Sequence, residues 1–288
     1  MFNISVFTVM LPELTPEEGA AALQRHGYAG VEWRVVDEVR PDGSAGRLAY
    51  WGANRCTLPV NEESAIRARD LAAAHGLTVP GLGTYINVGD LELTERAMRF
   101  AQTCGARNIR VNPGRWPDRE GLSYADSFTR ATRFLEGCQE LARQYNVRAI
   151  VELHHGTITC SASLAQRLVA PFDPDFIGVL HDAGNMAREG YEHYDLGFQV
   201  LGPWLAHVHI KNARYLPPGG DAGLWLADWS PLEDGVVDWD ALFSALKRAG
   251  YEGWLGIEDF SAARPVDEAL AHNIGFLNAA IARAFDSA

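Results

Sequence analysis

Four short apolar runs in the second half of the chain end in carboxylate, imidazole or amine side chains. They are Val151-Glu152-Leu153-His154, Leu180-His181-Asp182, Val208-His209-Ile210-Lys211 and Ile257-Glu258-Asp259. Each run is typical of the end of a buried β-strand, and the intervals between runs leave room for a helix. Polar side chains that converge from four parallel strand ends predict a metal site, and few folds can bring such ends together.

Strands and helices alternate along the whole chain. The sequence predicts strands over residues 3–9, 31–34, 79–85, 108–112, 149–153, 177–180, 206–210 and 254–257. It predicts helices over residues 16–26, 65–74, 91–103, 124–145, 164–169, 196–201, 239–248 and 266–285. Eight such pairs in 288 residues predict a single (β/α)8 TIM-barrel domain over residues 1–288, with the active site at the C-terminal mouth of the strands. A doubly wound sheet is the alternative, but its glycine-rich phosphate-binding first turn is missing.

The alternation of side chains along the strands supports a barrel, because successive side chains of a strand point to opposite faces. One set is apolar throughout, as a helix-facing layer requires: Val31, Trp33, Ile109, Val111, Val151, Leu153, Val179, Val208, Ile210, Leu255 and Ile257. The other set carries Glu32, Arg34, Arg110, Asn112, Glu152, His154, Asp182, His209, Lys211 and Glu258. The polar side chains therefore share the lumen and one end of the predicted barrel.

The predicted metal ligands are Glu152, Asp182, His209 and Glu258. Three carboxylates that converge without a cation would raise one another's pKa, and a divalent ion removes that repulsion. Three oxygen donors and one nitrogen donor favour Mn2+ first, then Mg2+, Co2+ or Fe2+; Zn2+ prefers more nitrogen or sulfur but remains possible.

Two segments are longer than ordinary barrel connections. Residues 37–62 are polar and contain Tyr50 and Trp51, which suggests a lid over the mouth. Residues 215–229 contain two prolines, several glycines and two tryptophans. The second segment is predicted to cover the mouth or to contact a neighbouring subunit in a homodimer or homotetramer.

Composition excludes several other classes of protein. A formal charge of −12 argues against a nucleic-acid surface, which usually carries a basic patch. No apolar run is long enough to cross a membrane, and no signal peptide is recognised, so we expect a cytoplasmic protein. The four cysteines form no CxxC pair, which argues against a zinc knuckle or a thiol redox motif.

Several motifs resemble the sugar phosphate isomerase/epimerase group of the xylose isomerase-like TIM-barrel superfamily. They are Glu-x-His at 152–154, His-Asp-x-Gly-Asn at 181–185, His-Val-His-Ile-Lys at 207–211, residues 231–239, and Gly-Tyr-Glu-Gly at 250–253 before Ile-Glu at 257–258. The resemblance implies that Glu152, Asp182, His209 and Glu258 bind the metal. It also implies that Glu152 and Glu258 exchange protons with the substrate, as in ketose 3-epimerases.

The chain departs from the ketose 3-epimerase pattern at two places. Asn185 stands where those epimerases carry a histidine, and no acid follows Glu152 at the sixth position. Asn185 or His154 would then take the place of that substrate-contacting histidine. The DNA-repair endonucleases of the same superfamily need further histidines, where this chain has Glu32, Tyr85, Asn87 and Asn112, so that function is disfavoured.

The expected activity is metal-dependent isomerisation or epimerisation of a keto-sugar or sugar phosphate. A glutamate would move a proton through a metal-stabilised enediolate, and Lys211 would stabilise the developing oxyanion or donate a proton. The alternatives are a dehydratase acting on a cyclitol or 3-keto-sugar, as inosose dehydratases do, and a sugar-binding protein without catalysis. The residues predicted to contact the carbohydrate are His154, Asn185, Arg110, Arg214 and Trp116.

Overall fold

The computed structural model describes residues 2–39, 49–218, 223 and 225–286. The strands are β1 (Asn3–Phe7), β2 (Gly30–Val36), β3 (Thr57–Pro59), β4 (Gly81–Ile86), β5 (Asn108–Val111), β6 (Arg148–Glu152), β7 (Ile177–Asp182), β8 (Leu205–Ile210), β9 (Asn212–Leu216), β10 (Leu226–Ser230) and β11 (Trp254–Ile257). The helices are α1 (Pro16–Arg25), α2 (Glu62–Ala74), α3 (Leu91–Cys104), α4 (Tyr124–Tyr145), α5 (Ala162–Val169), α6 (Ala183–Arg188), α7 (Tyr194–Leu201), α8 (Trp239–Arg248) and α9 (Val266–Asp286).

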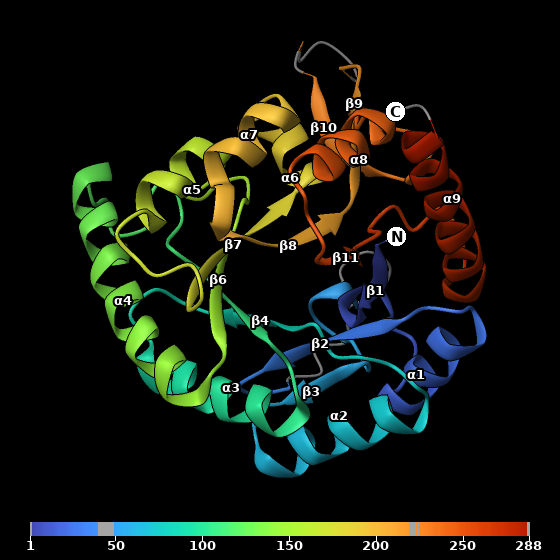
Figure 1. The fold of residues 1–288 in the computed structure, drawn as a ribbon, viewed down its shortest axis with the longest axis horizontal. Helices are drawn as coiled ribbons and strands as arrows, with labels where there is room; N and C mark the ends of the chain where they lie inside the picture. The colour runs from blue at the N-terminus through green and yellow to red at the C-terminus, as the bar shows by residue number, and fades with distance from the viewer. Residues whose placement is uncertain (1, 40–48, 219–222, 224, 287–288) are drawn as a thin grey trace.

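Eight parallel strands close into a barrel, and the helices form a ring around it (Figure 1). The barrel order is β1, β2, β4, β5, β6, β7, β8 and β11, and β11 pairs with β1 to close the sheet. This arrangement confirms the predicted (β/α)8 barrel. No helix among the described residues is long and apolar enough to cross a membrane.

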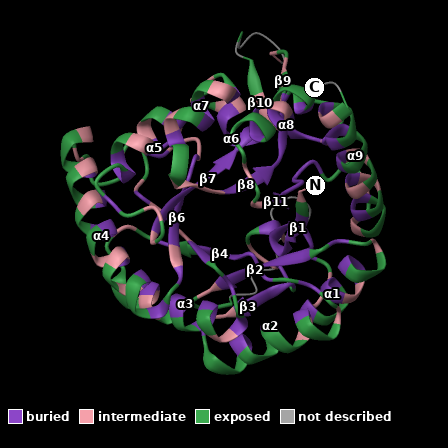
Figure 2. Cartoon of the chain, viewed as in Figure 1, coloured by how far each residue is buried: buried purple, intermediate pink, exposed green. Residues whose placement is uncertain are grey.

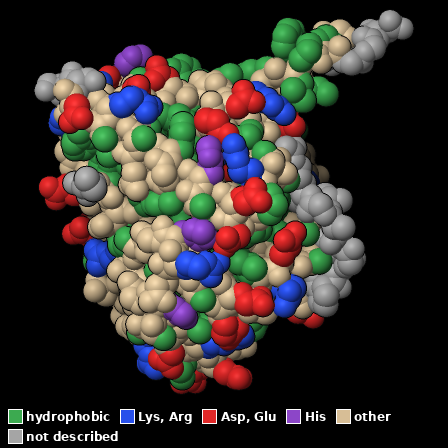
Figure 3. Space-filling view, turned by 90° about the vertical axis from the view of Figure 1, so that its right-hand side faces the viewer, with side chains coloured by type: hydrophobic (Ala, Val, Ile, Leu, Met, Phe, Trp, Pro, Cys, Tyr) green, Lys and Arg blue, Asp and Glu red, His purple; other side chains and the backbone are tan. Residues whose placement is uncertain are grey.

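The two side-chain sets of each strand separate as predicted. Every member of the apolar set is buried in the layer between strands and helices, and Trp33 is its largest fully buried member. Figure 2 shows this division, with buried strands inside and exposed residues on the outer helix surfaces. On the side at the right of Figure 1, acidic and basic side chains of the described residues are interspersed (Figure 3).

Phe7 of β1 fills the barrel lumen below the mouth, and Gly83 of β4 makes room for it. A Cβ atom at position 83 would lie 2.0 Å from the Phe7 ring, far inside van der Waals contact. The Phe7 ring in turn stacks on His209, with 5.9 Å between ring centroids. The Phe7 ring, for which Gly83 makes room, therefore packs against the imidazole of His209.

Several short elements differ from the sequence-based prediction. Thr57–Pro59 forms β3, which pairs with the end of β2 where β1 no longer reaches, so this part of the predicted lid belongs to the sheet. Residues 40–48 of that lid lie outside the described residues. The short helix α6 follows β7 directly, because Asp182 accepts a hydrogen bond from the Asn185 backbone and caps the helix.

The segment after β8 forms an antiparallel hairpin of β9 and β10. The hairpin stands out from the ring of helices (Figure 1) and exposes Tyr215, Trp225 and Leu226, while Trp229 at its base is buried. It therefore contributes one side chain to the mouth and presents apolar side chains to solvent. Contact with a neighbouring subunit stays a prediction.

Candidate metal centre

The side chains of Glu152, Asp182, His209 and Glu258 converge at the C-terminal mouth of the barrel. Each offers a ligand atom, and these atoms all lie within 4.8 Å of one another. Glu152 and Asp182 are the last residues of β6 and β7, His209 lies near the end of β8, and Glu258 follows β11. All four are buried, so the fold brings together the four residues that the sequence singled out as ligands.

The spacing of these atoms leaves room for an ion. His209 Nδ1 lies 3.8 Å from Asp182 Oδ2 and 4.0 Å from Glu258 Oε2. An ion at about 2.0 to 2.2 Å from nitrogen and oxygen ligands fits between atoms separated in this way. His209 Nδ1 is fully buried and has no hydrogen-bond partner among the described residues. A buried nitrogen that faces two carboxylates without a partner fits a divalent cation.

Lys211 places its ammonium group among the same carboxylates. Its Nζ lies 2.7 Å from Asp182 Oδ2 and forms a short contact with Glu258 Oε2. Burial acts to lower the pKa of Lys211, but these carboxylates act to raise it. The net effect is a raised pKa, so the amine is charged. Nζ also lies 4.8 Å from the centre of the Trp229 ring and 5.3 Å from that of Phe260. The ammonium therefore offsets part of the charge that a metal ion would offset.

Glu152 is held from both sides. Its Oε2 accepts a hydrogen bond from Arg110 Nη1 at 2.9 Å, and its Oε1 accepts one from Asn185 Nδ2 at 2.9 Å. Burial acts to raise the pKa of Glu152, but the positive charges of Arg110, His154, Lys211 and His209 together outweigh burial and keep the pKa low. Glu152 is therefore a fixed, ionised carboxylate.

The pKa values of Asp182 and His209 are both raised, but for different reasons. Burial, together with the nearby charges of Glu152 and Glu258, raises the pKa of Asp182 although Lys211 acts against it. For His209, burial lowers the pKa, but the carboxylates of Glu32, Glu258 and Glu152 together outweigh burial and raise the pKa to about 9. Without a metal ion, bound protons thus offset part of the negative charge of the carboxylates. A bound cation would take the place of these protons.

A cavity of about 700 Å³ opens above the centre. Glu152, Glu258 and Lys211 line it, and Trp51, Trp229 and Phe260 form apolar parts of its wall. Asp182 and His209 are fully buried beneath these side chains. A small molecule in the cavity would therefore meet two glutamates, an ammonium group and aromatic rings.

Of the five residues predicted to contact the carbohydrate, two line this cavity and three do not. His154 and Arg110 line it. Asn185 is fully buried behind Glu152 and also accepts a hydrogen bond from His155 Nδ1 at 3.1 Å. Arg214 pairs with Asp234 at 3.1 Å, and Trp116 packs edge-on against Tyr124, and neither lines the cavity. Direct contact of these last three predicted residues with substrate stays a prediction.

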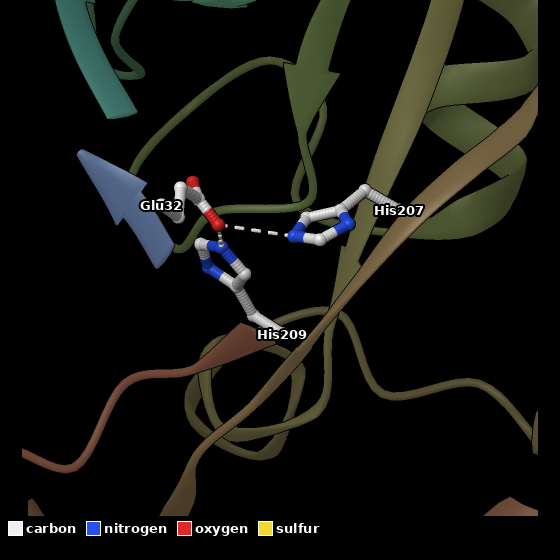
Figure 4. Close-up of side chains that lie close together, drawn as sticks. All are labelled: Glu32, His207 and His209. Carbon is white, nitrogen blue, oxygen red and sulfur yellow. Dashed lines mark hydrogen bonds and ion pairs between the residues drawn. The ribbon is translucent and has the colours of Figure 1, made fainter. Parts of the chain in front are cut away.

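Sequence reasoning missed several residues of the site. His155, Arg188 and Phe260 line the cavity, whereas Trp229, which also lines it, belongs to the segment that was predicted to cover the mouth. His207 lies below the centre and shares a carboxylate with His209, as Figure 4 shows. The signal for His207 was present, because it lies two residues before His209 and must face the same side of β8.

Comparisons with known proteins agree with the fold. A family model described as a xylose isomerase-like TIM barrel matches residues 20–280. An inosose dehydratase of Lacticaseibacillus casei is 25% identical over 156 residues, which are 50% of this chain and 52% of that protein. The chain thus aligns with about half the length of the curated relatives it matches.

Solved structures share the fold over nearly their whole length. An L-ribulose 3-epimerase has a TM-score of 0.73 at 16% identity, with 100% of this chain and 97% of that chain covered. The IolI protein with a bound zinc atom has a TM-score of 0.73 at 15% identity, with 98% of each chain covered. These likenesses concern the fold.

Proposed function

We propose, from the premise that the chain belongs to the xylose isomerase-like TIM barrel family, that it is a metal-dependent enzyme acting on a small carbohydrate. The observation that carries the proposal is the convergence of Glu152, Asp182, His209 and Glu258 within 4.8 Å at the floor of the cavity. We take Mn2+ as the first candidate and Zn2+ as the second, because the related IolI structure has zinc bound.

The chemistry we propose is proton transfer next to a carbonyl group. A divalent ion held by the four ligands would polarise the carbonyl of a keto-sugar or sugar phosphate and acidify the neighbouring C–H bond. Glu258 is the better base, because both carboxylate oxygens of Glu152 already accept hydrogen bonds from Arg110 and Asn185. Glu152 would then serve on the opposite side of the substrate as the partner for proton return.

Lys211 has the position and charge to assist this step. Its side chain lines the cavity, and its ammonium group lies beside Glu258. It would stabilise the negative charge that develops on oxygen while the proton is on the glutamate. Return of the proton to another carbon or face gives isomerisation or epimerisation.

A dehydratase is the second candidate function. It shares the first proton transfer and differs in losing a β-hydroxyl group from the enediolate. The observation that favours it is the similarity to inosose dehydratases, at 25% identity over half the chain. The two candidates predict the same metal centre and the same base, and differ only in the product.

Solvent-deuterium incorporation tests the proposal. Metal-loaded protein is incubated in deuterated water with a panel of ketoses, aldoses, inososes and their phosphates, and substrates and products are followed by mass spectrometry. Deuterium exchange without loss of water from the substrate indicates an isomerase or epimerase. Loss of water indicates a dehydratase. Binding without exchange or turnover across the panel would indicate a sugar-binding protein and contradict the proposal.

A further inference from the structure

A buried bridge crosses the barrel lumen directly beneath the metal centre. Glu32 Oε2 lies 3.0 Å from His207 Nε2 and 3.1 Å from His209 Nε2 (Figure 4). Glu32 belongs to β2 and both histidines belong to β8, so the bridge spans strands that are not neighbours in the barrel. All three residues are almost completely buried, and none of them lines the cavity.

Of the two strands between them, β11 makes room for this bridge. Gly256 lies on β11, and a Cβ atom there would be 2.9 Å from His207 Nε2 and 3.1 Å from Glu32 Oε2. Any larger residue at this position would press on both partners of the hydrogen bond. The bridge therefore depends on the absence of a side chain at position 256.

Glu32, His207 and His209 could themselves be taken for a second metal site, because they also lie close together. The hydrogen-bond geometry argues against this. Both ring nitrogens meet the distance and direction of an N–H···O hydrogen bond to the same carboxylate oxygen, within the range of about 2.7 to 3.2 Å that is typical of such bonds. The observed separations are 3.0 and 3.1 Å. In contrast, the separations from His209 Nδ1 to Asp182 and Glu258 are 3.8 and 4.0 Å.

We propose that Glu32 is a positioning residue that prepares His209 to bind the metal ion through Nδ1. By accepting the Nε2–H hydrogen bond, the carboxylate selects the tautomer that leaves the Nδ1 lone pair facing Asp182 and Glu258. It also fixes the rotation of the ring and makes the imidazole a stronger electron donor. The bridge rests on the proposed metal centre, but on neither candidate reaction.

His207 has a supporting part in this arrangement. Its Nε2 hydrogen-bonds the same Glu32 oxygen, so it fixes the carboxylate that in turn orients His209. Burial acts to raise the pKa of Glu32, but His209 and His207 outweigh burial and leave that pKa lowered. Loss of His207 should weaken the metal site less than loss of the Glu32 charge does.

Metal affinity measured without any substrate tests the proposal. Zn2+ binding to chelator-treated full-length protein is measured by competition with a chromogenic chelator, for wild type and for Glu32→Gln. We expect Glu32→Gln to lower the affinity by about 10- to 100-fold. The matched control is Glu233→Gln, because Glu233 also bonds a histidine, His272 at 2.9 Å, far from the centre on an exposed face. That control should bind Zn2+ as wild type does.

A spectroscopic signature separates positioning from general destabilisation. In the zinc-loaded wild type, the Nε2–H proton of His209 should resonate far downfield in the NMR spectrum, because it is buried and bonded to a carboxylate. In Glu32→Gln this resonance should move upfield. Unchanged affinity together with an unchanged resonance would overturn the proposal.

Two further outcomes are decisive. If Glu32→Gln fails to fold, His207→Gln reports in its place, with an expected loss of affinity of about tenfold, and wild-type affinity would overturn the proposal. If wild-type protein itself binds no divalent ion, the metal centre and the proposed function fail together. If the wild type binds Zn2+ and Glu32→Gln binds it with the same affinity, the proposed role of Glu32 fails while the metal centre stands.

Discussion

Glu258 and Glu152 are both glutamates at the floor of the cavity, but their carboxylates are held differently. Glu152 accepts hydrogen bonds from two side chains, whereas Glu258 is bonded by the flexible ammonium of Lys211. Replacing Glu258 by glutamine removes the proposed base and one ligand charge while keeping the volume. We expect the rate of solvent-deuterium exchange to fall by about 10²- to 10⁴-fold.

Glu252→Gln is the control for this prediction, because Glu252 is exposed and lies six residues earlier in the chain. It should exchange at the wild-type rate. An undiminished exchange rate in Glu258→Gln, with metal still bound, would exclude Glu258 as the base and leave Glu152 as the candidate.

Lys211 competes with the metal ion for two of its ligands. Because its ammonium contacts both Asp182 and Glu258, Lys211→Met should raise divalent-metal affinity by about tenfold, or roughly 1.4 kcal/mol. The same change should lower the exchange rate, since the cation beside the reacting oxygen is lost. Isothermal titration with Mn2+ and the exchange assay measure the two effects separately.

Lys247→Met is the matched control, because Lys247 is the other lysine of the sequence and bonds the Phe285 carbonyl oxygen on the exterior. It should alter neither quantity. Lower metal affinity in Lys211→Met would show that the ammonium supports the metal site instead of competing with it.

The sequence could place the four proposed ligands but not the bridge beneath them. Alternation along single strands put Glu152, Asp182, His209 and Glu258 on the lumen side, and the structure brings them together. The bridge from Glu32 to β8 was not predictable in this way, since it depends on which strands face each other across the lumen. Nor could spacing reveal that Asn185 turns its amide to Glu152 instead of the cavity.

At the scale of elements, regular segments were predictable and short ones were not. The predicted bounds of α4, α8 and β11 agree with the structure, because hydrophobic spacing and strong capping signals define them. The strand β3 and the helix α6 have 3 and 6 residues, which is too short for periodicity to be read. The strand β3 depends on a tertiary contact with the free edge of β2, and α6 depends on the local cap from Asp182.

Gly83 gives a test of how β4 and β1 approach each other. A methyl group at this position would collide with the Phe7 ring, so Gly83→Ala should destabilise the fold by about 1 to 3 kcal/mol. Gly275→Ala is the control, because Gly275 lies within α9 and its added methyl would meet no atom within 4 Å. That change should stabilise by about 0.5 to 1 kcal/mol. Urea unfolding measures both, and equal stability of the two variants would contradict the packing described.

At the scale of the whole molecule, three buried thiols set an alkaline limit to stability. Burial raises the pKa of Cys56 and Cys138 to about 12 and that of Cys104 to about 11, from 9.0. The unfolded chain releases these protons above pH 9 while the folded chain keeps them, so the free energy of unfolding should fall as pH rises. Each thiol contributes a slope of up to about 1.4 kcal/mol per pH unit between pH 9 and its folded pKa.

Urea unfolding at pH 8, 9 and 10 measures this effect. Cys138→Ala should show a shallower loss between pH 9 and 10 than wild type, because one of the three groups no longer titrates. A wild-type unfolding free energy that stays constant over this interval would contradict the burial of the thiols.

The closed barrel is what allows residues from four separated segments of the chain to surround one ion. The most direct measurement of this claim is a crystal structure of the protein soaked in Mn2+, with anomalous data collected near the manganese edge. We expect one strong peak about 2.0 to 2.3 Å from carboxylate oxygens of Glu152, Asp182 and Glu258 and from His209 Nδ1. A peak bound to His209 through Nε2, or no peak among these four side chains, would contradict the account.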